Sequence, residues 1–440
     1  MPDERKPNIL FFFTDQQRWD TLGCYGNPME FTPHLDRLAA EGVRFEQAFT
    51  CQPVCGPARA CLQTGTYATA NGVWCNGVPL RKDQPFVAEQ LRAAGYATGY
   101  IGKFHLSTTQ TAPVPAGDRI GYDFWEAADI LEFTSHPYGG RMFDADNKPV
   151  EFSDQYRVDF QTDRAIDFMG RPHGKPFFLF LSFLEPHFQN DMRRFVGPDG
   201  SKERFRDPWV PLDLRDKPGD WPWELPDYYG CCAALDTAMG RIVARLKERG
   251  LYDNTLIVFT SDHGCHFRTR NSEYKRSCHE SSIRIPMIVH GPGFTGGSVV
   301  HDLAGLIDLP PTLLDSAGVP APAVFHGSSL APLGRGDRSH AREEVFVQIS
   351  EAEVGRAIRT DRWKYAVYAP DKDGGVHPSS PVYVDRYLYD LKADPHESVN
   401  LIGRGGFHRN VADDLMERLK RRMAEAGEAV PEIRKAEYYA

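Results

Sequence analysis

Residues 7–17 read PNILFFFTDQQ, an unbroken apolar stretch that is followed at once by polar side chains. A strand that is buried on both faces has this pattern, because all of its side chains must then be apolar. Such strands occur in parallel sheets that are covered by helices on both sides. The stretch therefore predicts a strand at the centre of an α/β fold, with Asp15 and Gln16 at its carboxyl end.

The sequence that follows alternates between helix and strand patterns. Helices are predicted at 33–42, 87–95, 156–169 and 228–250, and strands at 43–49, 97–101, 176–183 and 255–260. This order predicts a large, mostly parallel central sheet with helices on both faces. In such sheets ligands bind beyond the carboxyl ends of the strands. Polar residues that follow different strands are therefore expected to meet at one edge of the sheet.

The order of elements changes near residue 327. Before it we expect one large domain, 1–326, with two insertions at about 107–155 and 188–225 that lack periodicity. Long irregular segments on such a scaffold commonly form lids or binding loops. After it, short strands at 344–349, 355–360, 363–369 and 387–390 precede a helix at 410–426. This pattern predicts a smaller C-terminal α+β subdomain, 327–440, with a short antiparallel sheet.

Composition and charge exclude several function classes. The 440 residues carry a formal net charge of −9, which argues against a nucleic-acid-binding surface. The richest apolar stretch, 177–183, is far too short to cross a bilayer, so no membrane partner is expected. Nine cysteines without regular spacing do not indicate a disulfide framework. The start, Met1 to Pro7, lacks a signal-peptide pattern, and we expect a cytoplasmic protein.

Two polar pairs, Asp15-Gln16 and Asp262-His263, each follow a predicted strand. Carboxylate and amide oxygens favour a hard divalent cation such as Ca²⁺, and an imidazole among the ligands shifts the preference towards Mn²⁺. Either pair alone is also typical of a turn after a strand. The presence of both pairs at strand ends favours a cation site over two unrelated turns.

Several positively charged or titratable groups are expected at the same edge. Cys55 lies at or just before a predicted helix N-terminus, where negative charge is stabilised, and Arg59 follows on that helix. Four further side chains come after predicted strands or after the second polar pair, namely Lys103, His105, His187 and Lys275. Each of these residues taken alone is also compatible with a surface or packing role. Together they favour a site for an anionic ligand.

Cys55-Gly56-Pro57-Ala58-Arg59 resembles the Cys-x-Pro-x-Arg signature of type I sulfatases of the alkaline phosphatase superfamily, in which a maturation enzyme oxidises the cysteine to formylglycine. The resemblance runs in order along residues 7–320. It also includes Ile9 to Gln16, Thr32 to Ala39, Gly102 to Leu106, Phe259 to Gly264, Glu280 to Pro286, Gly291 to Gly293 and Ile307 to Leu314. Gly102 to Leu106 is similar to the family's Gly-Lys-Trp-His-Leu segment.

The resemblance implies a sulfuric ester hydrolase that releases sulfate, with a carbohydrate sulfate expected as substrate. It implies a metal held by Asp15, Gln16, Asp262, His263 and the modified Cys55, and Arg59 holding the formylglycine hydrate. Ca²⁺ is expected, with Mn²⁺ or Mg²⁺ as alternatives. Lys103, His105, His187 and Lys275 would surround the sulfate. His187 or Lys275 would protonate the leaving alcohol, and His105 would deprotonate the second hydroxyl of the hydrate. The implied partners are a small-molecule or oligosaccharide sulfate ester and a formylglycine-generating maturation enzyme.

Two departures from the family pattern keep other functions open. The metal loops commonly read Asp-Asp and Asp-Asn, whereas Gln16 and His263 stand at the second positions here. Both variants resemble those of phosphonate monoester hydrolases and choline sulfatases in the same superfamily. A phosphonate monoester or phosphodiester hydrolase is therefore one alternative. Because a fold does not prove an activity, a catalytically silent binding protein is another.

The residues that select the organic half of the ester are harder to identify. The candidates lie near the motifs or in the insertions, and they are Trp74, Asn76, His136, Arg193, Arg194, Arg268 and His279. Aromatic rings and guanidinium groups of this kind stack on sugars and pair with acidic groups. A structural or surface role is the alternative for each. The sequence leaves the oligomeric state open, and a homo-oligomer is compatible with it.

Overall fold

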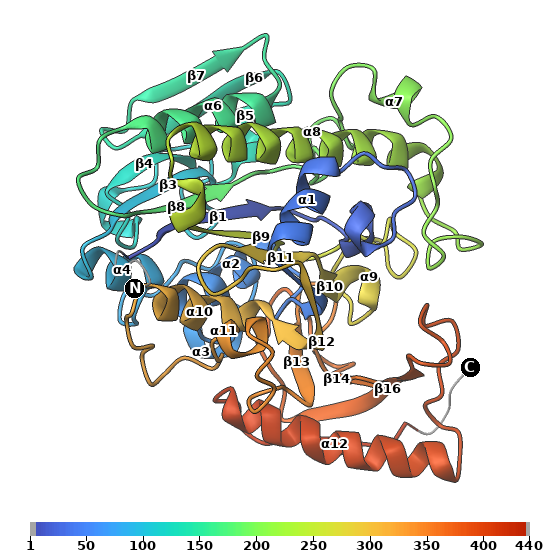
Figure 1. The fold of residues 1–440 in the computed structure, drawn as a ribbon. Helices are drawn as coiled ribbons and strands as arrows, with labels where there is room; N and C mark the ends of the chain where they lie inside the picture. Colours follow the sequence, from blue (N-terminus) through green and yellow to red (C-terminus); the bar gives the residue numbers. More distant parts are fainter. Residues whose placement is uncertain (1–5, 437–440) are drawn as a thin grey trace.

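The computed structural model describes residues 6–436, which form a central sheet of 12 strands and a second sheet of 5 strands. The predicted central strand is β1 (Asn8–Thr14), which is buried along its whole length. It is parallel to both of its neighbours, β8 (Phe177–Ser182) and β9 (Thr255–Ser261). The α/β fold with a mostly parallel central sheet is therefore confirmed (Figure 1).

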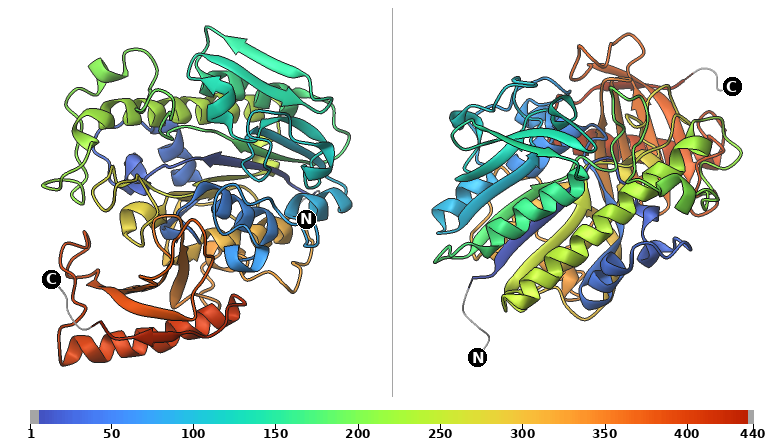
Figure 2. Two further views of the ribbon diagram at one scale, coloured as in Figure 1. Left: turned by 180° about the vertical axis from the view of Figure 1, so that it is seen from behind. Right: turned by 90° about the horizontal axis from the view of Figure 1, so that it is seen from above.

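The side chains of β1 alternate between two separate cores. Ile9, Phe11 and Phe13 belong to one apolar cluster, and Leu10 and Phe12 belong to another. Because successive side chains of a strand point to opposite faces, both faces of the sheet need helices over them. One face is covered by α1 (Pro33–Glu41), α6 (Arg157–Gly170) and α8 (Trp221–Glu248), and the other by α2 (Cys55–Thr64), α4 (Val87–Ala93) and α10 (Leu309–Ser316). Figure 2 shows α6 and α8 side by side over the sheet.

The strand order brings several carboxyl ends to one edge of the sheet. The order is β10-β2-β11-β9-β1-β8-β3-β4-β6-β5, with β12 beside β2 and β7 beside β6. The remaining strands are β2 (Val43–Phe49), β3 (Ala97–Lys103), β4 (Phe124–Ala128), β5 (Ser135–His136), β6 (Gly139–Asp144), β7 (Pro149–Ser153), β10 (Arg284–Ile285), β11 (Met287–His290) and β12 (Ser298–Gly305). Since β9, β1, β8 and β3 are parallel neighbours, the residues that follow them lie close together.

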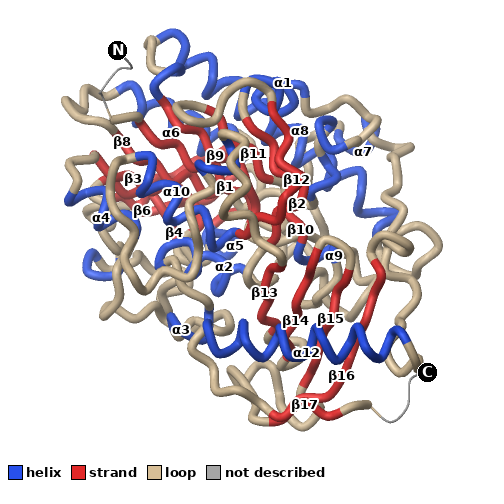
Figure 3. The backbone as a smooth tube through the Cα atoms, turned by 60° about the horizontal axis from the view of Figure 1, so that its bottom comes forward, coloured by secondary structure: helices blue, strands red, loops and turns tan. Residues whose placement is uncertain are grey.

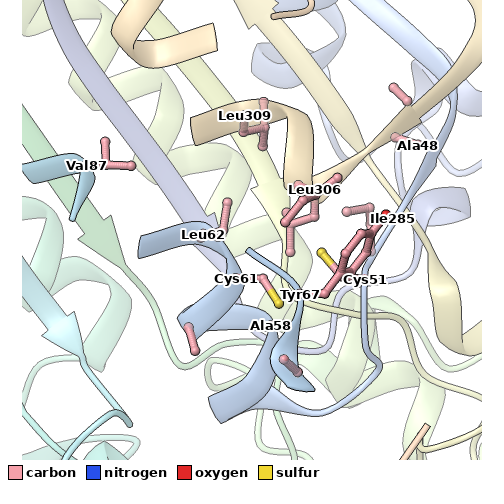
Figure 4. Packing of buried hydrophobic residues seen from close by; sticks show 14 of the residues in the cluster. Ala48, Cys51, Ala58, Cys61, Leu62, Tyr67, Val87, Ile285, Leu306 and Leu309 are labelled. Carbon is pink, nitrogen blue, oxygen red and sulfur yellow. The ribbon is translucent and has the colours of Figure 1, made fainter. Parts of the chain in front are cut away.

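The packing of α2 fixes its N-terminal end relative to the sheet. Cys61 and Leu62 of this helix lie in one apolar cluster with Leu306 and Leu309, which begin the short helix η5 (Leu306–Asp308) and α10 (Figure 4). Every residue of α2 is buried. A helix that is surrounded by close packing has little freedom to shift, and the position of Cys55 at its first residue is correspondingly well defined.

The C-terminal part forms the predicted small sheet. Its strands are β13 (Glu344–Ile349), β14 (Gly355–Thr360), β15 (Trp363–Tyr368), β16 (Val382–Asp390) and β17 (Glu432–Arg434), and α12 (Phe407–Glu425) lies across them (Figure 3). The first four strands are antiparallel neighbours, while β17, which the sequence did not indicate, pairs in parallel with β16. The boundary at residue 327 stays a prediction.

Two segments differ from their predicted form. The helix expected at 228–250 begins at Trp221, because Pro222 occupies the first turn, where a missing N–H costs nothing. The insertion at 107–155 is more regular than its sequence indicates, since it contains β4 to β7 and α5 (Leu131–Thr134). Its strands β6 and β7 form a hairpin at the edge of the central sheet. The other short helices are α3 (Ala68–Asn71), α7 (Ser201–Arg204), α9 (Glu280–Ile283) and α11 (Ala331–Gly334).

Three further expectations concern membrane-spanning helices, disulfide bonds and the N-terminal residues. Within residues 6–436, no helix combines the length and apolar character that a membrane crossing requires. All nine cysteines are free thiols. The N-terminal stretch, from which we expected no signal segment, lies outside the described residues as far as position 5.

Candidate active site

Four side chains from distant parts of the chain meet beyond the carboxyl ends of β1 and β9. Asp15 follows β1, Asp262 and His263 follow β9, and Cys55 is the first residue of α2. One ligand atom of each of these residues lies within 4.8 Å of the ligand atoms of the others, and all four residues are buried. Two unrelated turns after strands, the alternative for the two polar pairs, would not bring these side chains together. We call these four residues the cation cluster.

The chemistry of the cation cluster fits a divalent metal. Asp262 Oδ2 is buried and has no hydrogen-bond partner among residues 6–436. Burial and the nearby charge of Asp15 raise the pKa of Asp262 to about 7. His263 Nδ1 lies 2.9 Å from the carbonyl oxygen of Gly264, so that the ring donates there and presents Nε2 to the cluster. Two closely spaced carboxylates together with the Nε2 of His263 form a ligand set that suits a divalent cation.

Gln16 lies beside the cation cluster in a left-handed backbone conformation, with φ of 68°. Its backbone N–H donates to Asp262 Oδ1 at 2.9 Å, and its side-chain Nε2 donates to the sulfur of Cys265 at 3.5 Å. Gln16 also lines the cavity that opens from the cluster. Its backbone therefore orients Asp262, while metal binding by its amide group stays a prediction.

The side chain of Cys55 contacts a lysine, an imidazole and a carboxylate. Its Sγ lies 2.8 Å from Lys275 Nζ, 3.3 Å from His263 Nε2 and 3.4 Å from Asp15 Oδ1. Burial would raise the pKa of the Cys55 thiol, but the charges of Lys275 and Lys103 outweigh burial and hold it well below its usual range. The sulfur occupies the position that the oxygens of a formylglycine hydrate would take. This position is built to stabilise a negatively charged nucleophile.

Arg59 lies one turn after Cys55 on α2 and is almost fully buried. Its Nη2 binds Asp15 Oδ2 at 3.0 Å, and its Nη1 donates to the carbonyl oxygen of Lys103 at 2.8 Å and to Ser182 Oγ at 2.6 Å. These contacts join α2 to the ends of β1, β3 and β8. The structure thus shows Arg59 bracing the site, and its contact with a formylglycine hydrate stays a prediction.

Lys103 is the last residue of β3 and is completely buried between two carboxylates. Its Nζ lies 2.9 Å from Asp15 Oδ2 and 3.0 Å from Glu132 Oε1. Burial would lower the pKa of Lys103, but Asp15 and Glu132 outweigh burial and raise it above its usual range. Lys103 therefore stays charged. Glu132 was not predicted, because it lies in the insertion at 107–155 and has no motif around it.

His187 and Lys275 form a hydrogen-bonded pair on the other side of Cys55. Lys275 Nζ lies 3.2 Å from His187 Nε2, and His187 Nδ1 lies 2.7 Å from the carbonyl oxygen of Phe188. Burial and the charge of Lys275 lower the pKa of His187. The imidazole is therefore neutral at rest, with its Nε2 accepting from the ammonium group of Lys275.

His105 completes the set of predicted catalytic residues. It lines the same cavity as Cys55, has a left-handed backbone with φ of 57°, and its buried Nδ1 has no partner among the described residues. Such a backbone conformation is uncommon outside glycine and is concentrated at functional sites. All six predicted catalytic residues thus lie around one centre, namely Cys55, Arg59, Lys103, His105, His187 and Lys275.

A cavity of about 380 Å³ opens from this centre to the surface. Two of the predicted substrate-binding residues line it, Asn76 and Arg268. The carbonyl oxygen of the Asn76 side chain accepts the backbone N–H of Gly56 at 2.9 Å, next to Cys55. The lining that the sequence did not indicate comprises Ile130, Glu132, Phe133, Phe188, Asn190, Glu273, Tyr274 and Arg276. Five of these eight fall in the two insertions, where periodicity gives no signal.

The other predicted substrate-binding residues lie outside the cavity lining, and they are Trp74, His136, Arg193, Arg194 and His279. His136 is exposed and forms an ion pair with Asp191 at 2.9 Å. His279 is buried, and its Nε2 lies 3.2 Å from the hydroxyl of Tyr389 in the C-terminal sheet. The geometry gives these five residues no contact with the centre.

Family models match most of the chain. Residues 7–319 match the model described as Sulfatase. Residues 272–425 match the model of the C-terminal part of N-sulphoglucosamine sulphohydrolase. The first match includes the cation cluster and the six predicted catalytic residues, and the second includes the whole antiparallel part of the C-terminal sheet.

Individual proteins are similar over nearly the full length. The chain is 31% identical to an ulvan-active sulfatase of Formosa agariphila, with 99% of this chain and 84% of the relative aligned. It is 26% identical to an N-acetylglucosamine-6-O-sulfatase of Bacteroides thetaiotaomicron, over 95% of this chain and 86% of the relative. A crystal structure from Bacteroides fragilis, assigned as the sulfatase yidJ, has a TM-score of 0.84 at 27% identity and covers 98% of both chains.

Proposed function

We propose that this chain, which belongs to the sulfatase family and is a sulfuric ester hydrolase, acts on the sulfate ester of a carbohydrate. The observation that carries the proposal is that Cys55 lies in one buried centre with Lys275 and with the other three residues of the cation cluster. The names of the two curated relatives, an ulvan-active and an N-acetylglucosamine-6-O-sulfatase, support a carbohydrate as the organic half. The cavity of about 380 Å³ has room for a sugar ring beyond the sulfate position.

The metal of the proposal is Ca²⁺, held by Asp15, Asp262, His263, residue 55 and Gln16. Two carboxylates and an amide favour a hard cation, and His263 leaves Mn²⁺ and Mg²⁺ as alternatives. When bound, such a cation lowers the pKa of an oxygen nucleophile and offsets the negative charge of the sulfate. Metal analysis of the purified protein after dialysis against each cation tests this assignment.

Residue 55, once oxidised to formylglycine and hydrated, supplies one hydroxyl that attacks sulfur and a second that permits release of sulfate. Lys103 and Lys275 are placed to offset charge on the non-bridging oxygens. Lys275 holds the proton of its hydrogen bond with His187, so this pair is placed to protonate the leaving alcohol. His105 lines the same cavity and is placed to accept the proton of the second hydroxyl.

The first test is chemical. We expect the peptide that spans residues 51–65, from protein coexpressed with a formylglycine-generating enzyme, to carry an aldehyde or its hydrate at position 55. C55A should abolish both the modification and hydrolysis. The matched control is C61A, because Cys61 lies on the same helix but packs in the core. A peptide that retains its thiol in active protein would contradict the proposal.

The second test separates sulfate from phosphonate chemistry. Gln16 and His263 beside the metal position are the observation that favours a phosphonate monoester or phosphodiester hydrolase. We expect kcat/KM to be higher for a sulfated saccharide than for an aryl phosphonate monoester or a phosphodiester. The reverse order would assign the site to the second candidate. The family match makes the sulfate ester the stronger candidate.

Two parts of the proposal concern the cell. The formylglycine-generating enzyme is the expected maturation partner, because no side chain supplies the aldehyde unaided. We also propose a cytoplasmic location. Fractionation of the source organism, followed by detection of the protein, tests the location. Recovery of the protein outside the cytoplasm would contradict it.

A further inference from the structure

The outer part of the catalytic cavity contains an arginine whose charge is largely unmatched. Arg268 lines the same cavity as Cys55 and Lys275. Its side chain is 49% exposed, and its ion pair with a carboxylate is a long one, from Nε to Asp220 Oδ2 at 3.5 Å. Within residues 6–436, the terminal nitrogens of Arg268 donate no hydrogen bond, and the 3.5 Å contact with Asp220 is the shortest of its ion pair. The planar fork of the guanidinium is therefore free to bind a ligand.

The surroundings of Arg268 hold its side chain in place. Its guanidinium lies over the ring of Tyr274, at 4.7 Å from the centroid, and 6.0 Å from the centroid of Phe188. The Tyr274 hydroxyl donates to the same oxygen of Asp220 that faces Arg268. Phe267 and Arg268 both have positive φ, 47° and 62°. Two consecutive left-handed residues without glycine are unfavourable, and such conformations are concentrated at functional sites.

The other cations of the cavity differ from Arg268 in their pairing. Arg276 also lines the cavity, but its terminal nitrogens bind Glu273 at 3.0 Å and Glu351 at 2.5 Å. Lys275, the lysine of the lining, contacts Cys55 Sγ at 2.8 Å and His187 Nε2 at 3.2 Å. Of the two arginines in the lining, Arg268 is thus the one that retains a free fork. It is also the one whose guanidinium group lies over aromatic rings.

We propose that Arg268 binds a second anionic group of the substrate, either a carboxylate or a second sulfate, on the sugar that carries the scissile sulfate or on its neighbour. The inference rests on the proposed function, because it presumes that a sulfated saccharide occupies the cavity. An arginine fork binds carboxylate and sulfate oxygens through two parallel N–H donors. Phe188, which is half-buried in the cavity lining, provides an aromatic surface beside it for the apolar face of a sugar. The substrate class is therefore an acidic saccharide with at least two negative groups.

The test compares three substrates with matched variants. The first substrate is a monosulfated disaccharide of neutral sugars. The second has a uronic acid in place of the sugar without the sulfate. The third is the neutral disaccharide with a second sulfate. We expect the wild type to prefer one or both dianionic substrates in kcat/KM. In R268Q and R268A this preference should fall by about ten- to a hundredfold, the effect of one charge-assisted hydrogen-bonded pair, with the change mainly in KM. R206A is the control, because Arg206 is exposed and lies outside the cavity lining.

The outcomes separate this inference from the proposed function. Loss of the preference for the uronate substrate alone, or for the disulfated substrate alone, identifies which anion Arg268 binds. If the wild type hydrolyses all three substrates equally, or if R268Q and R268A retain the preference, the inference is wrong and the proposed function stands. If the wild type, with formylglycine present, hydrolyses no sulfated saccharide, both are wrong. Equal melting temperatures of the variants and the wild type show that the fold is intact.

Discussion

Replacing Asp262 by Asn tests whether repulsion between the carboxylates of Asp15 and Asp262 destabilises the folded protein when no cation is bound. Asp262 Oδ1 accepts the backbone N–H of Gln16 at 2.9 Å, and asparagine can keep that bond. Asp262 Oδ2 has no hydrogen-bond partner among residues 6–436 and faces the charge of Asp15. Without a cation, D262N should therefore melt at or above the wild type. With a cation, the wild type should melt higher, because the variant has lost a charged ligand.

The size of the effect follows from binding linkage. A cation present at 100 times its Kd stabilises the folded state by about 2.7 kcal/mol. Unfolding of 440 residues carries an entropy of about 0.9 kcal/mol/K, so the wild type should gain about 3 °C in Tm. If D262N binds the cation about a hundredfold more weakly, the gain at the same concentration falls to about 0.4 kcal/mol, which is less than about 1 °C.

The same pair of carboxylates predicts the pH dependence. In the folded protein the pKa of Asp262 is about 7, above the ordinary value of 3.8 for an aspartate. In EDTA, the stability that the protonated group contributes is present at low pH and is lost as the pH rises through 7. A proton competes with the cation below that pH. The increase in Tm that the cation causes should therefore be larger at pH 8 than at pH 6.

Differential scanning calorimetry in EDTA and in excess CaCl₂ measures these shifts. D129N is the control, because Asp129 is equally buried but accepts the backbone N–H groups of Ser107 and Gln110 at 3.0 Å, outside the cluster. D129N should melt lower than the wild type by the same amount with and without the cation. An equal cation-dependent gain in D262N and in the wild type would refute the reasoning.

Three further substitutions test the surroundings of the centre. E132Q removes the charge that lies 3.0 Å from Lys103 Nζ, and it should lower the free energy of unfolding by about 2 kcal/mol in urea titrations and reduce kcat. G102A should destabilise the protein by more than about 2 kcal/mol in the same titrations, because its Cβ would lie 1.9 Å from the carbonyl oxygen of Ser182 at a φ of 106°. E351A should raise KM about fivefold with a smaller change in kcat, because Glu351 of the C-terminal part binds Arg276 of the cavity lining. An unchanged KM would show that the C-terminal part does not contribute to substrate binding.

Much of the inner site could be read from the sequence. Asp15, His187 and Asp262 each follow a strand and Lys103 ends one, and parallel strands place such residues at one edge. Gln16 was found in the same way, although the structure shows its backbone, and not its amide, acting on Asp262. These positions depend on local patterns of strand and loop, which a sequence displays directly.

The outer site could not be read in this way. Glu132 and Phe133 lie on a single helical turn within an insertion, and their contacts are set by the hairpin that packs beside them. His279 stands beside a motif and His136 lies in an insertion, yet His279 is buried against the C-terminal sheet and His136 pairs with Asp191 at the surface. Proximity along the chain does not predict which way an irregular segment turns.

The sequence by itself determined the α/β fold, the strand ends and the identity of the residues that form the centre, because buried strands and capped helices leave periodic patterns. Only the tertiary structure decided how those residues are paired. It placed Lys103 between two carboxylates, set Lys275 against Cys55 and left the fork of Arg268 free. The physical reason is that charge pairing and cavity shape depend on contacts between segments far apart in the chain, and no local pattern records them.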